Sequence, residues 1–298
     1  GWSAQCPRCD TTTSGSAMTV HGGGRRLQCH HCGLRRPVPP ACPDCAGLAL
    51  QPQGAGTERI EETLAGRFPD VPVLRIDRGS TRRRDALESL LGDLGDRPGI
   101  LVGTQMLAKG HDLPQLALVV VVGIDEGLFS ADFRAPEKLA QLLVQVAGRA
   151  GRAARRGEVL LQTHHPGHPL LQLLVTGGYH AFADAELGQR EAAGFPPFAH
   201  LALLRAEAKD IEATRAFLGA ARAMFADALG DAATVELLGP IPAPMPRRAG
   251  YQRMQLVLSA PARRDLHALL DTTVKPLHAL PEARRVRWSL DIDPSDLY

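Results

Sequence analysis

Six cysteines, all within the first 45 positions, make up the first candidate site of this chain. They form three pairs with two residues between the cysteines: Cys6 with Cys9, Cys29 with Cys32, and Cys42 with Cys45. This spacing lets both thiolates of a pair reach one tetrahedral ion, and two pairs complete a four-cysteine zinc site. Disulfides are disfavoured because no secretory pattern is present, and a redox pair would need a β-α-β context that these cysteines lack. The sequence therefore predicts a zinc module over residues 1–50 with one pair left unmatched.

A second candidate site is the segment Gln-Val-Ala-Gly-Arg-Ala-Gly-Arg that begins at Gln145. At 3.6 residues per turn, Gln145, Arg149 and Arg152 lie on one face of a helix. Gly148 and Gly151 weaken a helix interior, so they indicate close approach of a backbone or a phosphate. Guanidinium groups offer planar donor pairs that match phosphate oxygens. The alternative is a solvated basic helix end; such a face needs no glycines, and we favour a polyphosphate site.

This segment resembles motif VI of the superfamily 2 helicases. With GTQMLAKGHDLP (103–114), LFSADFR (128–134) and residues 145–171 added, the chain resembles the PriA family of replication-restart helicases. The resemblance runs from residue 1 to residue 298. It implies the C-terminal portion of such a helicase, without the N-terminal DNA-binding domain and the first motor lobe.

The resemblance assigns roles to both groups of cysteines and polar residues. It implies that Cys6, Cys9, Cys29 and Cys32 share one zinc ion, and that Cys42 and Cys45 belong to a second site truncated ahead of Gly1. It implies that Arg149 and Arg152 stabilise charge on the γ-phosphate of ATP, while Gln145 aligns the nucleotide or the attacking water. A motif V likeness implies a further group that couples DNA to the nucleotide: Gly103, Thr104, Gln105, Lys109, Gly110 and Asp112.

One carboxylate pair imitates a magnesium site. Asp125 and Glu126 follow a valine run, as in a Walker B strand, but the sequence contains no G-x-x-x-x-G-K-[ST] to present phosphates and magnesium. We interpret both residues as inter-lobe or structural groups. ATP and Mg²⁺ binding would come from the first lobe, so this chain alone is expected to be inactive.

The elements that position these residues follow from hydrophobic patterning. Residues 51–177 alternate apolar strands (71–76, 100–103, 116–124, 158–163) with helices (57–67, 82–94, 136–151), and Thr57 is expected to cap the first helix. Continuous apolar strands predict a parallel sheet buried on both faces, which is an α/β RecA-like helicase lobe 2. The cysteine module is then an insertion in this lobe.

A second fold follows a connecting helix and linker at 178–198. Residues 199–298 read as strand 199–206, helix 210–228, strands 234–238 and 253–259, helix 261–278 and strand 285–291, an α+β split β-α-β arrangement. Four prolines between the central strands predict an exposed loop. Its basic end predicts a DNA-binding surface, with a solvated loop as the alternative: Arg247, Arg248, Tyr251 and Arg253. The resemblance adds that Arg263 and Arg264 are positions that could dock the acidic tail of single-stranded DNA-binding protein.

Composition limits the possible functions. A net charge of +2 and 4% aromatic residues give no global signature of nucleic-acid binding. The sequence contains no run of 18 apolar residues, so it does not predict a membrane span. The resemblance implies part of an ATP-dependent 3′–5′ DNA helicase that recognises stalled or forked DNA and initiates primosome assembly. The expected protein is a monomer of the bacterial cytoplasm and nucleoid that binds Zn²⁺, single-stranded and forked DNA, single-stranded DNA-binding protein and primosomal proteins. A non-catalytic zinc-containing DNA-binding scaffold with a degenerate motor is the alternative, and an RNA-directed helicase is a third.

Overall fold

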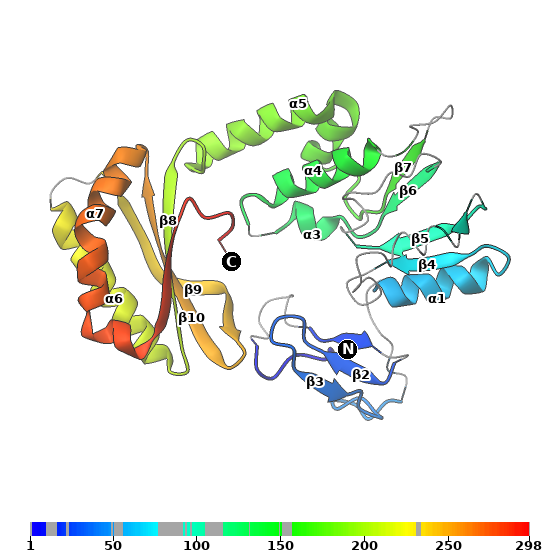
Figure 1. Cartoon of the computed structure of the whole chain (residues 1–298), viewed down its shortest axis with the longest axis horizontal. Coiled ribbons are helices and arrows are strands. Elements are labelled where there is room, and N and C mark those ends of the chain that lie inside the picture. Colours follow the sequence, from blue (N-terminus) through cyan, green and yellow to red (C-terminus); the bar gives the residue numbers. More distant parts are fainter. Residues whose placement is uncertain are drawn as a thin grey trace. The chain divides into compact units, whose positions relative to one another are not determined.

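The computed structural model describes residues 2–9, 17–21, 24–48, 50, 56–76, 92, 94–95, 97–104, 116–130, 132–148, 150, 157–230 and 234–297 (Figure 1). Two compact units account for the chain. The terminal unit consists of Gly1–Ala49, Ser130–Pro136 and His180–Tyr298, and the lobe unit consists of Leu50–Phe129 and Glu137–Tyr179. The chain therefore crosses between the units more than once, and the crossings after Pro136 and after Tyr179 lie inside helices.

The cysteine module is a small antiparallel ribbon. Its strands are β1 (Thr19–His21), β2 (Arg26–Gln28) and β3 (Arg35–Pro37), and β2 lies between the other two. Met18 and Leu27 are buried with three of the cysteines. Because so few apolar residues are available, this module lacks the core that stabilises a larger domain, which is typical of a fold that depends on a metal.

The lobe unit contains two pairs of parallel strands. The first pair is β4 (Val73–Ile76) with β5 (Ile100–Gly103), and the second is β6 (Leu118–Val121) with β7 (Glu158–Leu161). Helices α1 (Thr57–Arg67), α3 (Asp125–Leu128) and α4 (Ala135–Ala147) connect or follow these strands. Parallel strands alternating with helices confirm the predicted α/β class.

Four expectations for this lobe need correction or fall outside the described residues. The α1 helix has the predicted span, but its N-cap is Gly56 without a side-chain hydrogen bond, so Thr57 is the first helical residue and not the cap. The β6 strand is shorter than predicted because the chain turns into α3. One face of the second strand pair packs on α4 and on the helix after β7, whereas Val120 and Leu160 are exposed, so this sheet is not buried on both faces. The helix predicted over 82–94 lies largely outside the described residues.

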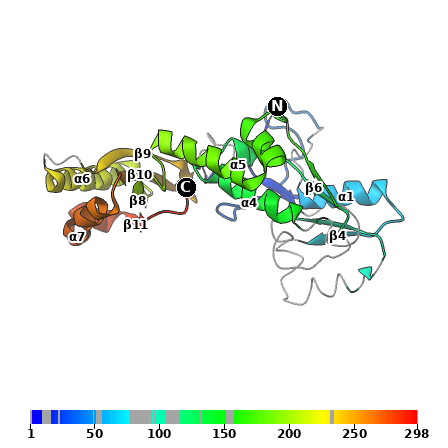
Figure 2. The same cartoon turned by 90° about the horizontal axis from the view of Figure 1, so that it is seen from above.

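A long helical element, α5 (Pro169–Ala193), begins earlier than predicted. Gly178 interrupts it with φ 75° and ψ −173°, a conformation that favours glycine, so two helices meet at this residue. Figure 2 shows α4 and α5 from above. Among the described helices, none has the length and apolar character needed to cross a membrane.

The C-terminal part of the terminal unit is the predicted β-α-β-β-α-β fold. Its elements are β8 (His200–Ala208), α6 (Ile211–Leu229), β9 (Glu236–Arg248), β10 (Tyr251–Ala260), α7 (Arg263–Ala279), the 3₁₀ helix η2 (Pro281–Arg285) and β11 (Arg287–Ile292). The strands form one antiparallel sheet in the order β11-β8-β10-β9, and α6 and α7 cover one face of it (Figure 1). Fully buried side chains such as Phe217, Phe225 and Leu256 fill the space between the helices and the sheet.

The proline-rich segment is a strand, so the predicted exposed loop is wrong. Pro240, Pro242, Pro244 and Pro246 all lie within β9. Because β9 is an edge strand, residues two apart direct their nitrogens to the same side, and the prolines can occupy the side that needs no hydrogen bond. The register pairs β9 with β10 at Glu236–Leu238, Ile241–Pro242 and Arg247–Arg248, with two register shifts between these stretches. Strands β9 and β10 therefore form a long hairpin whose tip holds the basic residues.

Candidate zinc, nucleotide and DNA sites

Four cysteine sulfurs of the ribbon form one compact group. The Sγ atoms of Cys6, Cys9, Cys29 and Cys32 all lie within 4.8 Å of one another. Cys6 Sγ is 3.6 Å from Cys32 Sγ, and Cys29 Sγ is 3.9 Å from Cys9 Sγ. A tetrahedron with metal–sulfur bonds of about 2.3 Å has edges of about 3.8 Å. The four sulfurs therefore fit a zinc ion, and they are the four that the sequence resemblance grouped.

Backbone geometry around the sulfurs supports this fit. Burial raises the pKa of the Cys6 thiol and raises the pKa of Cys9 to about 12. Burial also opposes ionisation of Cys29, but hydrogen bonds from the backbone N–H groups of Cys32 and His31 and from the side chains of Cys6 and Cys32 together lower the pKa of that thiol. N–H groups directed at sulfur are a feature of zinc-binding turns, because they stabilise thiolate charge. A bound zinc ion would hold both turns together and supply folding free energy.

The third cysteine pair lies apart from this group. Cys42 is buried and Cys45 is exposed, and the only metal-like cluster among the described residues excludes both. The turn between them is nevertheless formed, because Ala46 N–H donates to Cys42 O at 2.8 Å. Backbone N–H groups of Cys45 and Asp44 lower the pKa of Cys42. This pair therefore has the local geometry of a ligand turn without a partner turn among the described residues.

Residues of the β9–β10 hairpin tip, predicted to bind DNA, contact the ribbon in this structure. Arg247 Nη2 donates to Cys9 O at 3.0 Å, and Arg248 Nε donates to His31 O at 3.1 Å. The tip also donates a third hydrogen bond, from the Gly250 N–H to the carbonyl of Arg8 at 2.7 Å. The tip thus contacts both turns that carry the four clustered cysteines. The spacing of these arginines in the sequence does not distinguish this contact from DNA binding, because either partner is an acceptor of guanidinium N–H groups.

The two other members of the predicted basic stretch also have protein partners. Arg253 lies 3.8 Å from a Glu207 carboxylate oxygen and donates to Met245 O at 3.3 Å, and burial lowers its pKa. The Tyr251 ring lies under the Arg287 guanidinium at 4.5 Å. Each of these groups contributes to the sheet or its rim, and their role in DNA binding stays a prediction.

A basic concave surface that sequence analysis missed lies beside this ring. It has a volume of about 440 Å³, and cationic residues predominate over Glu207 and Asp210 in its lining. Its cationic members are Lys209, Arg284, Arg285 and Arg287. Arg284 and Arg285 are exposed on η2. The missed signal was the Arg-Arg-x-Arg spacing ahead of β11, which brings three cations to one end of the strand.

The two arginines proposed for partner docking lie at the start of α7. Arg263 Nη2 donates to Asp293 Oδ2 at 2.6 Å, and Arg264 Nε lies 3.4 Å from Asp265 Oδ1. The Arg264 side chain is 88% exposed, so its ion pair is largely screened by water. Both groups remain accessible to an acidic partner.

The nucleotide-coupling residues lie partly outside the described residues. Gly103 ends β5 and Thr104 follows it as an exposed residue. The α4 helix ends at Ala147, earlier than predicted, and Gln145 is exposed in its last turn, while Leu143 and Val146 face the core. The remaining motif V and VI residues fall outside the described residues: Gln105, Lys109, Gly110, Asp112, Arg149 and Arg152. A Cβ at Gly148 would make ordinary contact with Val144 O at 3.4 Å, so the described neighbours do not require glycine there.

The Asp125 carboxylate has a structural role in the lobe unit. It accepts hydrogen bonds from the Thr163 hydroxyl and, at 3.1 Å, from the His164 N–H. The Thr163 hydrogen bond, followed by the one from His164, lowers the pKa of Asp125. These bonds join the chain after β6 to the chain after β7. Asp125 is thus occupied by protein donors, as its interpretation as a structural group requires.

With this geometry established, comparison with known families identifies the class. Residues 55–154 match the helicase conserved C-terminal domain, which makes the lobe a helicase C-terminal lobe. Residues 6–37 match the PriA DNA helicase Cys-rich region domain, and residues 191–295 match the primosomal protein N C-terminal domain. The chain belongs to the PriA family. The predicted family, the zinc ribbon and the α+β C-terminal domain are thereby confirmed.

Three relatives, each described as replication restart protein PriA, illustrate the similarity. The Haemophilus influenzae protein is 45% identical over 298 residues, which cover 100% of this chain and 40% of that protein. The Bacillus subtilis protein is 39% identical over 99% of this chain and 36% of its own length. The Synechocystis protein is 39% identical over 99% of this chain and 34% of its own length. The chain therefore spans well under half of the relatives it matches.

Proposed function

We propose that this chain is the second motor lobe, zinc ribbon and C-terminal domain of an ATP-dependent 3′–5′ DNA helicase that restarts replication. The observation that carries this proposal is the combination of a helicase C-terminal lobe with a four-cysteine ribbon and a split β-α-β domain in one chain. A scaffold with a degenerate motor has no need of the two motif VI arginines, which the sequence retains.

In this proposal the chain completes a nucleotide site whose phosphate-binding half lies in a first motor lobe. The α4 helix brings Gln145 to its exposed end, directly before Arg149 and Arg152. Arg152 reaches the γ-phosphate, Arg149 supports it, and Gln145 aligns the nucleotide or the attacking water. Gly103, Thr104, Gln105, Lys109, Gly110 and Asp112 couple the DNA backbone to this site. Mg²⁺ and the P-loop belong to the first lobe.

DNA binding is assigned to the terminal unit. The concave surface at η2 offers exposed guanidinium groups to phosphates, and Arg247, Arg248, Tyr251 and Arg253 form the neighbouring hairpin. The acidic tail of single-stranded DNA-binding protein docks near Arg263 and Arg264, and primosomal proteins are further partners. The third cysteine pair contributes to a second zinc site. The protein acts as a monomer in the bacterial cytoplasm, associated with the nucleoid.

Activity of this chain by itself tests the proposal. The purified chain should bind forked DNA and show no DNA-stimulated ATP hydrolysis, because its sequence has no P-loop. A longer protein that adds a first motor lobe should hydrolyse ATP in response to the same DNA. DNA-stimulated turnover by this chain alone would show that it is not a second lobe, and absence of fork binding would remove the DNA-binding role of the terminal unit.

A further inference from the structure

Phe133 lies in the loop ahead of α4, yet it packs with the C-terminal domain. Phe133 stacks on Phe195 with ring centroids 5.1 Å apart and an angle of 6° between the ring planes. Phe133 also packs on a small apolar cluster of β8 and β10 whose buried members are Leu201, Leu203 and Val257. This cluster lies apart from the main core between the sheet and its helices.

A cation and the C-terminal tail hold Phe133 in this cluster. The Arg190 guanidinium lies 5.4 Å from the Phe133 ring centroid and donates to Phe133 O at 3.4 Å. Glu186, one turn earlier in α5, pairs with Arg190 at 3.0 Å, and both side chains are close to fully buried. Buried ion pairs keep a fixed geometry because separating them leaves an uncompensated charge. Arg190 is therefore fixed in position against the aromatic ring.

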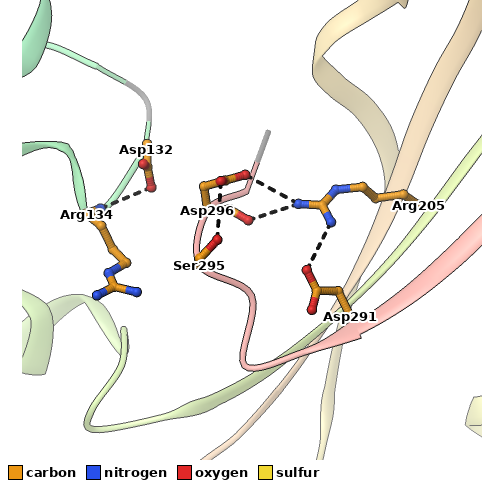
Figure 3. Close-up of polar contacts among 6 residues, drawn as sticks. All are labelled: Asp132, Arg134, Arg205, Asp291, Ser295 and Asp296. Atoms are coloured by element: carbon orange, nitrogen blue, oxygen red, sulfur yellow. Dashed lines mark hydrogen bonds and ion pairs between the residues drawn. The ribbon is translucent and has the colours of Figure 1, made fainter. Parts of the chain in front are cut away.

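The C-terminal tail covers the same cluster. Figure 3 shows Arg205 between Asp291 and Asp296, which it contacts at 3.3 Å and 3.5 Å. Arg205 Nη2 also donates to Asp296 O at 3.0 Å. The next residue, Leu297, packs on the cluster that holds Phe133. Arg205 thus holds the tail against β8 and β11 next to the residue that packs on this cluster.

The same segment starts α4. Asp132 is buried, and its Oδ1 accepts from Arg134 N–H at 3.1 Å, while its carbonyl accepts from Ala135 N–H at 2.9 Å (Figure 3). Such a turn fixes the direction in which a helix leaves its first residue. From Ala135 the helix runs without interruption to Ala147, a rise of about 18 Å at about 1.5 Å per residue. Gln145 lies in the last turn of this helix.

We infer that Phe133 is a positioning residue through which the C-terminal domain holds the start of α4 and thereby orients motif VI. The inference rests on the proposed function only for what motif VI does. It gives the Ser130–Arg134 segment a role that its sequence did not suggest: a DNA-induced shift of the C-terminal domain is transmitted along α4 to the nucleotide. Arg190, Phe195 and Leu297 form the receiving surface.

Hydrogen exchange in this chain directly tests whether the contacts of Phe133 hold the start of α4. In a helix that begins at Ala135, the N–H groups of Leu139 and Ala140 are the first to bond within the helix. Phe133→Ala and Phe195→Ala should each accelerate exchange at these amides by at least about tenfold, with zinc content and the unfolding temperature of the C-terminal domain retained. Phe129→Ala is the matched control, because the Phe129 ring makes edge-on contacts with His165 and His168 in the lobe unit. Unchanged exchange at Leu139 and Ala140 in both test variants would overturn the inference.

The longer protein with both lobes tests the coupling. Phe133→Ala should lower the DNA-stimulated kcat by a factor in the range of about 5 to 150, the usual size of coupling between sites, and leave KM for ATP and DNA-free hydrolysis unchanged. Phe133→Tyr, which retains the stack, should restore most of the stimulation. Faster exchange with full DNA stimulation would overturn the coupling. Absence of ATP hydrolysis in the unmutated longer protein would instead contradict the proposed function. The exchange experiment would still decide whether Phe133 holds the start of α4.

Discussion

The contact between the β9–β10 hairpin tip and the zinc ribbon predicts that Arg247 controls zinc retention. Arg247→Ala removes a charged donor 3.0 Å from the carbonyl of Cys9, one of the four clustered cysteines. A hydrogen bond from a charged donor contributes about 1.5–3 kcal/mol, and the low end applies because Arg247 is only half-buried. A loss of about 1.5 kcal/mol is about a tenfold change in an equilibrium constant. The turn at Cys9 should therefore open about ten times more often.

Zinc transfer to a chelator measures this opening. When zinc release follows the opening of a turn, Arg247→Ala should release zinc about tenfold faster than the unmodified chain at equal zinc content. Arg248→Ala should have a smaller effect, about fivefold or less, because Arg248 is exposed. Arg222→Ala is the control, because Arg222 is an exposed arginine on α6 and not on the β9–β10 hairpin. Equal release rates for Arg247→Ala and Arg222→Ala would show that the hairpin contact does not stabilise the ribbon.

Three further predictions follow from the sites. Cys29→Ser should abolish tight zinc binding and unfold the ribbon, whereas Cys45→Ser should retain about one zinc equivalent by metal analysis, because only Cys29 belongs to the four-sulfur group; equal zinc loss in both variants would contradict this grouping. The folded-state pKa of Asp125 lies below its ordinary value of 3.8, so its stabilising effect is complete above that value and is lost as the pH falls through the folded-state pKa. Asp125→Asn should therefore flatten the acid limb of a plot of unfolding free energy against pH. An unchanged acid limb would show that the Asp125 carboxylate does not contribute to acid unfolding. Replacing both Arg284 and Arg285 with Ala should weaken binding to forked DNA. The slope of the logarithm of the binding constant against the logarithm of the salt concentration should fall by the amount expected for about two phosphate contacts. An unchanged slope would show that η2 does not contact the DNA backbone.

Local patterning predicted most of the elements and the C-terminal topology. Apolar patterning located α6, α7 and β11, because these elements bury one regular face against a single core. The strand predicted at 234–238 covers the start of β9, but the proline-rich continuation was missed. Four prolines forbid a central strand, and the sequence does not reveal that this strand lies at an edge. The early start of α5 was missed because a glycine with positive φ joins two helices that patterning treats separately.

Sites set by local spacing could be predicted from the sequence, whereas sites set by contacts between distant residues could not. Cysteine spacing is a local property, so the ribbon could be predicted from sequence, although the grouping of the pairs needed the family resemblance. The partners of Arg247 and Phe133 are distant in the chain: Cys9 lies 238 positions from Arg247, and Phe133 O accepts from Arg190 57 positions away. No periodicity encodes such contacts. A guanidinium group also has the same appearance in a sequence whether a carbonyl, a carboxylate or a phosphate receives it.

The account depends most on the claim that this lobe supplies arginines to a nucleotide bound elsewhere. The direct measurement replaces Arg152 with Ala in a protein that contains both motor lobes and compares DNA-stimulated ATP hydrolysis with fork affinity. Removal of an arginine that stabilises the transferring phosphoryl group reduces turnover by about 10³ to 10⁵. We expect a loss of that order with fork affinity nearly unchanged, and little rescue by Arg152→Lys, because lysine lacks the planar donor pair. Equal losses of hydrolysis and fork affinity would contradict the claim and would place Arg152 in DNA binding or in the fold.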